Sequence, residues 1–144
     1  MAYVQSLRVR FEEVDFARIV YFPRLLGYCH SVFEDFFEKE VGVTYADMLI
    51  KRRVGFPVVR TEGDFKSPLR FGDVCRVVME TNNLGRRSVT CGYRLHLAES
   101  DKLCAEVEIV SVVIDMDKFQ SVDIPKDVSA AFLRHLASRP ESGH

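Results

Sequence analysis

The segment from residue 11 to residue 37, FEEVDFARIVYFPRLLGYCHSVFEDFF, constrains the fold of this chain more than any other. From Pro23 to about Glu40, apolar residues recur at intervals of three and four, which predicts a long helix with a broad apolar face. Proline favours the first position of a helix, and Gly42 is typical of a residue that ends one. A curved sheet would cover so wide a face. The residues on it are Leu25, Leu26, Cys29, Val32, Phe33, Phe36 and Phe37.

The rest of the chain supplies strands for such a sheet. Loose alternation of apolar and charged residues over 3–12 predicts a strand before the helix. Short polar connections in the second half suit antiparallel hairpins. Strands are expected there at residues 56–65, 74–82, 88–97, 102–115 and 119–124. Shorter helices are expected over Thr44–Lys51 and from Pro125 onward. This order of elements predicts an α+β fold in which an antiparallel sheet buries one helix.

Composition bounds the domain and the class of protein. A chain of 144 residues with 47% hydrophobic and 28% charged residues suits one globular domain, expected over residues 1–138 with a disordered tail at 139–144. The net charge of -1 provides no basic field for nucleic acid or an anionic membrane. No run approaches the roughly 18 apolar residues of a membrane span, and the N-terminus lacks a signal-peptide core. We therefore expect a cytoplasmic protein.

The four cysteines, Cys29, Cys75, Cys91 and Cys104, form no CxxC pair and have no histidine at metal-ligand spacing. Their neighbours are mostly apolar, which predicts buried, reduced thiols. No metal site is predicted.

The loop before the long helix holds the candidate catalytic residue. Asp15 lies eight residues before Pro23, where strand alternation has been lost. The first N–H groups of a helix have no partner within it and attract negative charge. A carboxylate close to them suits attack on an acyl group whose oxygen those N–H groups polarise. The alternative is that Asp15 is a loop residue that stabilises the helix end.

From Asp15 to the helix, the sequence DFARIVYFPRLL resembles the motif of hotdog-fold acyl-CoA thioesterases of the 4-hydroxybenzoyl-CoA thioesterase type. The resemblance covers residues 7–124 and implies a hotdog fold, a sheet wrapped around one central helix. Arg18 departs from the pattern because the family usually has glycine there, and it puts bulk and charge beside the loop where substrate binds. His30 departs too, at a position where relatives commonly carry an acid. The matching residues are Asp15, Ile19, Val20, Tyr21 and Pro23.

The resemblance also implies roles for individual groups. The backbone N–H of Phe22 matches the position that polarises the thioester carbonyl, and Tyr21 lines the site. Asp15 is then either the nucleophile that forms an acyl-enzyme anhydride or the general base for a water molecule, and the sequence leaves both routes open. No metal or organic cofactor is required.

Further residues are candidates for binding the substrate. Arg86 and Arg87 match positions where the family binds the CoA phosphates; the alternative is an ordinary solvated turn. His30 and Glu34 lie one turn apart on the helix, where they either reach a pocket or form a solvated pair, and Glu34 is the second candidate for the catalytic carboxylate. Phe56 is a candidate for lining the acyl pocket.

Together these features predict a thioesterase that hydrolyses an aromatic or a short- to medium-chain acyl-CoA. A hotdog dehydratase or hydratase is the second enzyme class, but it requires a histidine that the Asp15 loop lacks. A non-catalytic acyl-CoA-binding module would keep Arg86 and Arg87 and need no carboxylate at Asp15. The resemblance implies a homodimer or homotetramer. His96, His135 and His144 carry no functional prediction.

Overall fold

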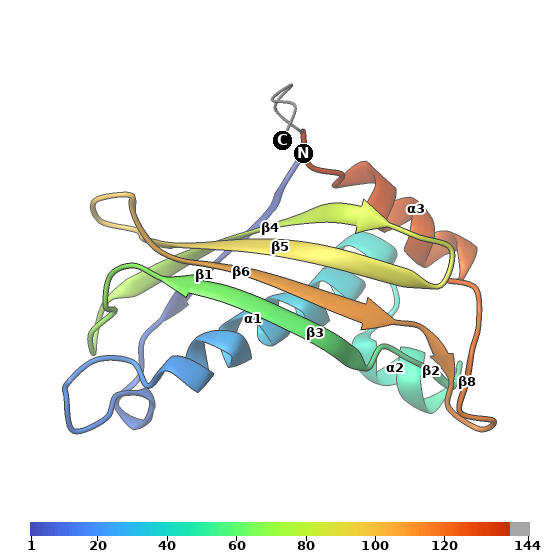
Figure 1. Cartoon of the computed structure of the whole chain (residues 1–144), viewed down its shortest axis with the longest axis horizontal. Coiled ribbons are helices and arrows are strands. Elements are labelled where there is room, and N and C mark those ends of the chain that lie inside the picture. Colours follow the sequence, from blue (N-terminus) through green and yellow to red (C-terminus); the bar gives the residue numbers. More distant parts are fainter. Residues whose placement is uncertain (139–144) are drawn as a thin grey trace.

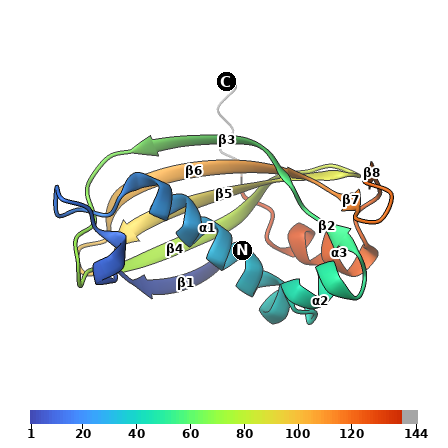
Figure 2. The same ribbon diagram turned by 90° about the horizontal axis from the view of Figure 1, so that it is seen from below.

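One antiparallel sheet of five strands curves around the long helix α1 (Figures 1 and 2). The computed structural model describes residues 1–138, so the tail predicted at 139–144 lies outside the described residues. The strand order β1-β4-β5-β6-β3 leaves β1 and β3 at the two edges. The sheet wrapped around one helix is the arrangement predicted from the sequence. The strands are β1 Tyr3–Arg8, β3 Val58–Phe65, β4 Val74–Leu84, β5 Ser88–Leu97 and β6 Lys102–Val112.

Helix α1 spans Phe22–Phe36 and continues into a π-helical turn, Phe37–Val41. Gly42 ends this turn with a φ of 87°, a left-handed conformation that glycine adopts without strain. The predicted helix from Pro23 to about Glu40 is therefore confirmed to within one residue at each end. Most of its predicted apolar face is buried against the sheet, and the buried members are Leu25, Cys29, Val32, Phe33, Phe36 and Phe37.

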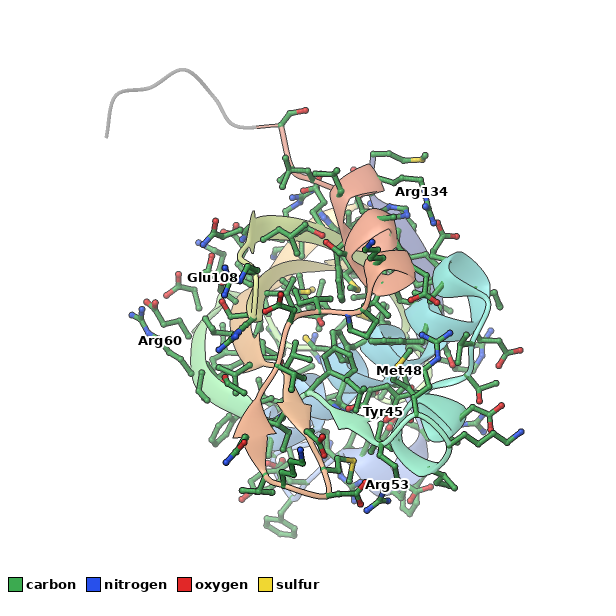
Figure 3. All side chains as sticks on the ribbon, turned by 90° about the vertical axis from the view of Figure 1, so that its right-hand side faces the viewer. Tyr45, Met48, Arg53, Arg60, Glu108 and Arg134 are labelled. Atoms are coloured by element: carbon green, nitrogen blue, oxygen red, sulfur yellow. The ribbon has the colours of Figure 1, made fainter. Side chains whose placement is uncertain are left out.

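A smaller three-stranded sheet and two short helices cover one end of the core. Thr44 caps α2, because its hydroxyl accepts a hydrogen bond of 3.0 Å from the Asp47 N–H. Figure 3 shows Tyr45 and Met48 of α2 pointing inward, and Met48 is fully buried. Phe132 of α3 stacks on Phe36 with ring centroids 5.0 Å apart. The elements are α2 Tyr45–Ile50, β2 Val54–Gly55, β7 Ile114–Asp115, β8 Gln120–Ser121 and α3 Lys126–Arg134.

Four predicted strands are shorter in the structure: those over 56–65 and 119–124 are reduced to β3 and β8, and two others end early or divide. The strand predicted over 3–12 ends at Arg8, because the Val9 N–H donates to the Asp73 carbonyl and the chain then enters a 3-10 turn at Phe11–Glu13. The strand predicted over 102–115 is divided: β6 ends at Val112, and β7 belongs to the smaller sheet. Alternation within a strand cannot show where its pairing partner changes.

All four cysteines are free and buried, as predicted. Burial raises the pKa of Cys29, Cys75 and Cys91 to about 12. His135, for which no function was predicted, is buried, and its Nε2 lies 2.6 Å from Glu40 Oε1. This contact ties α3 to the turn that ends α1. No helix within residues 1–138 is long and apolar enough to cross a membrane.

Candidate functional site

The loop that carries Asp15 is closed by its own hydrogen bonds. The Asp15 N–H donates to the Ile19 carbonyl over 3.0 Å, and the Arg18 N–H donates to the Asp15 carbonyl over 2.9 Å. Oδ1 of Asp15 accepts a 2.8 Å hydrogen bond from the Ala17 N–H. The carboxylate is exposed to solvent and held in one orientation, so a substrate or a water molecule can reach it.

Arg18 adopts a left-handed backbone conformation, with a φ of 70°. L-residues other than glycine pay about 1–2 kcal/mol in this region. The backbone at Arg18 thus has the conformation that glycine would accept without strain, although the residue is an arginine. Its side chain is exposed, and no carboxylate in the described part of the chain lies within 4.0 Å of it.

The start of α1 presents the N–H group that the sequence singled out. The Tyr21 N–H donates to the Glu13 carbonyl, Pro23 has no N–H, and the Arg24 N–H donates to the Tyr21 carbonyl. Among residues 1–138, no acceptor takes the Phe22 N–H. This donor therefore remains available at the positive end of the helix, a few residues after Asp15. The Tyr21 ring is half exposed and lies beside the Phe22 ring, with centroids 5.9 Å apart.

An apolar hollow of about 280 Å³ lies between the start of α1 and the end of β3. The Val20 N–H donates to the Leu69 carbonyl and holds its two walls together. The rings of Phe22 and Phe65 meet edge to face, with centroids 5.7 Å apart. Because Ile19 and Val20 form part of the lining, the hollow adjoins the loop that carries Asp15. Its apolar lining includes Ile19, Val20, Phe22, Leu25, Phe65 and Leu69.

His30 and Glu34 lie further along α1. His30 Nδ1 is 2.7 Å from Glu34 Oε2, and the two side chains are 44% and 48% exposed. A helix rises 1.5 Å per residue, so these residues lie about 12 and 18 Å beyond Phe22 along the axis. Within one chain they form a partly exposed pair away from Asp15.

Arg86 and Arg87 lie in the hairpin between β4 and β5, at the opposite end of the sheet from the Asp15 loop (Figure 1). Their Nε atoms lie 3.2 and 2.8 Å from Oδ1 of Asp123, which both arginines share. Strand β4 separates this hairpin from the other end by roughly 33 Å at 3.3 Å per residue. One chain therefore does not bring the predicted phosphate-binding arginines to Asp15.

Phe56 is buried in the aromatic core rather than exposed in the hollow beside Asp15. Its ring meets Phe37 and Phe33 edge to face, with centroids 5.0 and 6.1 Å away.

A second groove, of about 430 Å³, lies on the other side of α1 and was not predicted from the sequence. Arg8 and Arg10 line it from the first strand and the residues after it, and Arg24 lines it from the helix. No sequence motif could reveal this group, because its members belong to separate elements and only their packing brings them together.

Comparison with known proteins agrees with this architecture. The family model of the thioesterase-like superfamily matches residues 9–132. A 1,4-dihydroxy-2-naphthoyl-CoA hydrolase of Nostoc punctiforme (strain ATCC 29133 / PCC 73102) is 27% identical over 128 residues, which cover 89% of this chain and 84% of the relative.

Solved structures share the fold. That of a 1,4-dihydroxy-2-naphthoyl-CoA thioesterase from Synechocystis superposes with a TM-score of 0.85 at 22% identity, covering 92% of this chain and 96% of the other. The structure of a gentisyl-coenzyme A thioesterase superposes with a TM-score of 0.79 at 25% identity, covering 88% of this chain and 98% of the other. The predicted hotdog fold and thioester-hydrolase class are thereby confirmed, and the chain belongs to the thioesterase-like superfamily.

Proposed function

We propose that this protein hydrolyses an acyl-CoA to the free acid and CoA at the start of α1, with Asp15 as the catalytic carboxylate. The observation that carries this proposal is the exposed Asp15 carboxylate beside a helix start whose Phe22 N–H has no acceptor among residues 1–138. The names of the relatives and structural neighbours support the reaction class.

The Phe22 N–H acts as the donor to the thioester oxygen. Negative charge develops on that oxygen as the carbonyl carbon is attacked, and one well-aimed donor stabilises it by up to about 3–4 kcal/mol. Tyr21 flanks the thioester, and the Arg18 guanidinium contacts the substrate at the mouth of the loop. These are the roles that the sequence predicts for the two residues.

Asp15 serves the reaction by one of two routes. As a general base it takes a proton from water, the resulting hydroxide bonds to the carbonyl carbon, and the C–S bond breaks to release the CoA thiolate. As a nucleophile its carboxylate displaces the thiolate and forms an anhydride, which water then hydrolyses. Both routes use the same carboxylate and the same donor.

We further propose an aromatic acyl group as the substrate. The apolar hollow beside Asp15, with the Phe22 and Phe65 rings in its wall, suits a flat apolar group. The relatives named above act on 1,4-dihydroxy-2-naphthoyl-CoA and gentisyl-coenzyme A, whose acyl groups are aromatic.

A second subunit is part of the proposal, as a homodimer or a dimer of dimers in the cytoplasm. All eight residues of β3 are exposed, and among residues 1–138 this edge strand pairs only with β6. A free edge of this length favours pairing with another chain. Only from a second subunit would His30, Glu34, Arg86 or Arg87 approach Asp15.

The test is turnover of a panel of aromatic, short-chain and medium-chain acyl-CoAs, with thiol release followed for the wild type and for Asp15→Asn. We expect the aromatic thioesters to be hydrolysed fastest, and the variant to lose roughly 10²-fold or more in kcat. Glu12→Gln is the matched control, because Glu12 is an exposed acid three residues before Asp15. Unchanged turnover in Asp15→Asn would overturn the assignment of Asp15, and binding without turnover would identify a binding module.

A further inference from the structure

Besides Arg18, four arginines at the Asp15 end of the molecule lack carboxylate partners among residues 1–138. Within residues 1–138, no Asp or Glu oxygen lies within 4.0 Å of the side-chain nitrogens of Arg8, Arg10, Arg24 or Arg70, all of which are exposed. Other arginines pair with a carboxylate at 3.2 Å or less, namely Arg52, Arg53, Arg60, Arg76, Arg86, Arg87 and Arg94.

Two acids near these arginines in sequence accept hydrogen bonds from uncharged donors, whereas Glu12, two residues after Arg10, is exposed and forms no ion pair within residues 1–138. Glu13 Oε1 accepts from the Arg10 backbone N–H over 2.8 Å and from the Tyr28 hydroxyl over 2.6 Å. Asp73 Oδ2 accepts from the Arg70 backbone N–H over 2.8 Å. The guanidinium groups therefore keep their charge available to a ligand.

Two segments distant in sequence are joined here. The Val9 N–H donates to the Asp73 carbonyl over 2.8 Å, and the Gly72 N–H donates back to the Val9 carbonyl over 3.2 Å. Arg8 Nη1 adds a 3.1 Å hydrogen bond to the Gly72 carbonyl. These bonds hold residues 8–11 beside residues 70–73, so an Arg-Phe pair from each segment lies at one surface.

The two phenylalanines of these pairs form an exposed ring pair. The Phe11 and Phe71 rings meet edge to face with centroids 5.6 Å apart, although the residues are 76% and 61% exposed. Rings this exposed contribute little to the core, and flanking arginines make them suitable for stacking a nucleobase.

The basic groove runs from this corner along α1. Three arginines, Arg8, Arg10 and Arg24, line it together with one acid, Glu13, so arginine outnumbers carboxylate there. At Gly27, in the same lining, nothing lies within 4 Å of where a Cβ would be. The first turns of α1 thus separate the two cavities. Phe22 and Leu25 face the apolar hollow, whereas Arg24 and Tyr28 face the basic groove.

We propose that this corner binds the nucleotide part of CoA, with Arg10, Arg24 and Arg70 on its phosphates and the Phe11–Phe71 pair under its adenine. Guanidinium groups bind phosphate through paired, charge-assisted hydrogen bonds. This inference rests on the proposed function and extends it: a single chain supplies both the reacting end and the nucleotide end of the site, on two sides of one helix start. It competes with Arg86 and Arg87, whose charge is shared with Asp123.

The test measures binding of CoA and of adenosine 3′,5′-bisphosphate by calorimetry, apart from turnover. We expect Arg10→Ala/Arg24→Ala/Arg70→Ala to raise the Kd of both ligands about tenfold or more and to weaken its dependence on salt. Lys39→Ala/Lys118→Ala/Lys126→Ala removes the same charge from exposed positions outside this corner and should leave both Kd values unchanged. Phe11→Ala/Phe71→Ala should weaken binding of the bisphosphate and leave that of inorganic pyrophosphate unchanged.

The kinetic arm compares an acyl-CoA with the matching acyl-pantetheine. The arginine variant should raise KM for the acyl-CoA alone and keep kcat. The inference is overturned if both triple variants bind CoA with the same Kd, if Arg86→Ala/Arg87→Ala alone abolishes CoA binding, or if the wild type binds neither ligand. It is also overturned if the arginine variant changes KM for a carrier-protein thioester and not for the acyl-CoA. A wild type that binds the nucleotide as described but hydrolyses no thioester would overturn the proposed function and leave this inference standing.

Discussion

The two ends of the molecule use the same residue types in opposite ways. At the end that carries α2 and α3, every phenylalanine but Phe119 is at most 4% exposed, and the buried rings contact one another; Phe119, just before β8, is 79% exposed. At the Asp15 end, phenylalanines are at least 47% exposed. The buried set is Phe33, Phe36, Phe37, Phe56 and Phe132. The exposed set at the Asp15 end is Phe11, Phe16, Phe22, Phe65 and Phe71.

The arginines follow the same division. Arg52 and Arg53 at the α2 end pair with Asp127 and Asp117, and Figure 3 shows Arg53 at the surface of that end. The arginines around the Asp15 loop have no such partners among the described residues. One end therefore satisfies its rings and charges within the chain, where they stabilise the fold. The other leaves them free to meet a ligand, which is what a binding site requires.

The largest predicted effect on the free energy of unfolding is that of removing a buried ring at the end that carries α2 and α3. Phe132→Ala removes a fully buried ring that stacks on Phe36, so the free energy of unfolding should fall by about 3–5 kcal/mol. Phe71→Ala removes an exposed ring and should cost under about 0.5 kcal/mol. Denaturant unfolding measures both. Equal losses would show that the exposed rings also stabilise the fold, and the division between the ends would fail.

A smaller loss in the free energy of unfolding is expected when an arginine that pairs with a carboxylate is removed. The Arg52 guanidinium hydrogen-bonds to Asp127 and holds the pKa of that carboxyl below its usual value. Because the folded-state pKa is lowered, the stabilisation is present above the unfolded pKa and is lost as pH falls through the folded pKa. Arg52→Ala should therefore cost below about 1 kcal/mol at pH 7, since the pair is partly exposed.

Denaturant unfolding below about pH 4 should give a smaller difference in the free energy of unfolding between wild type and Arg52→Ala, because Asp127 begins to protonate there. Arg24→Ala, which removes an arginine without a carboxylate partner among residues 1–138, should show no such pH dependence. A constant difference for Arg52→Ala across this range would mean that the ion pair does not stabilise the α2 end.

The smallest effect concerns backbone strain at the Asp15 end. Arg18→Gly should raise the free energy of unfolding by about 0.5 kcal/mol, because relief of the left-handed conformation slightly exceeds the entropy cost of glycine. Arg24→Gly, in the first turn of α1, should instead lower it by about 1 kcal/mol. Destabilisation by both substitutions would show that the Arg18 side chain makes contacts that outweigh its strain.

Sequence reasoning was most successful where the signal is local. The period of the apolar residues determined α1, a short helix was correctly expected over Thr44–Lys51, where α2 lies, and alternation placed β5 at Ser88–Leu97. The segment from Asp15 to Pro23 also placed a carboxylate close in sequence to a helix start, which lies at Phe22 in the structure, while the catalytic role of Asp15 stays a prediction. Each of these features depends on residues a few positions apart.

Only the tertiary structure decided which groups share a surface. Arg86 and Arg87 could not be separated from Asp15 by any motif, because their distance is set by the length and pairing of β4. The corner formed by Arg10, Arg24 and Arg70 depends on hydrogen bonds between segments some sixty residues apart, such as that from the Val9 N–H to the Asp73 carbonyl. Local periodicity fixes which face of an element is buried, whereas the register between distant strands fixes what its exposed residues meet.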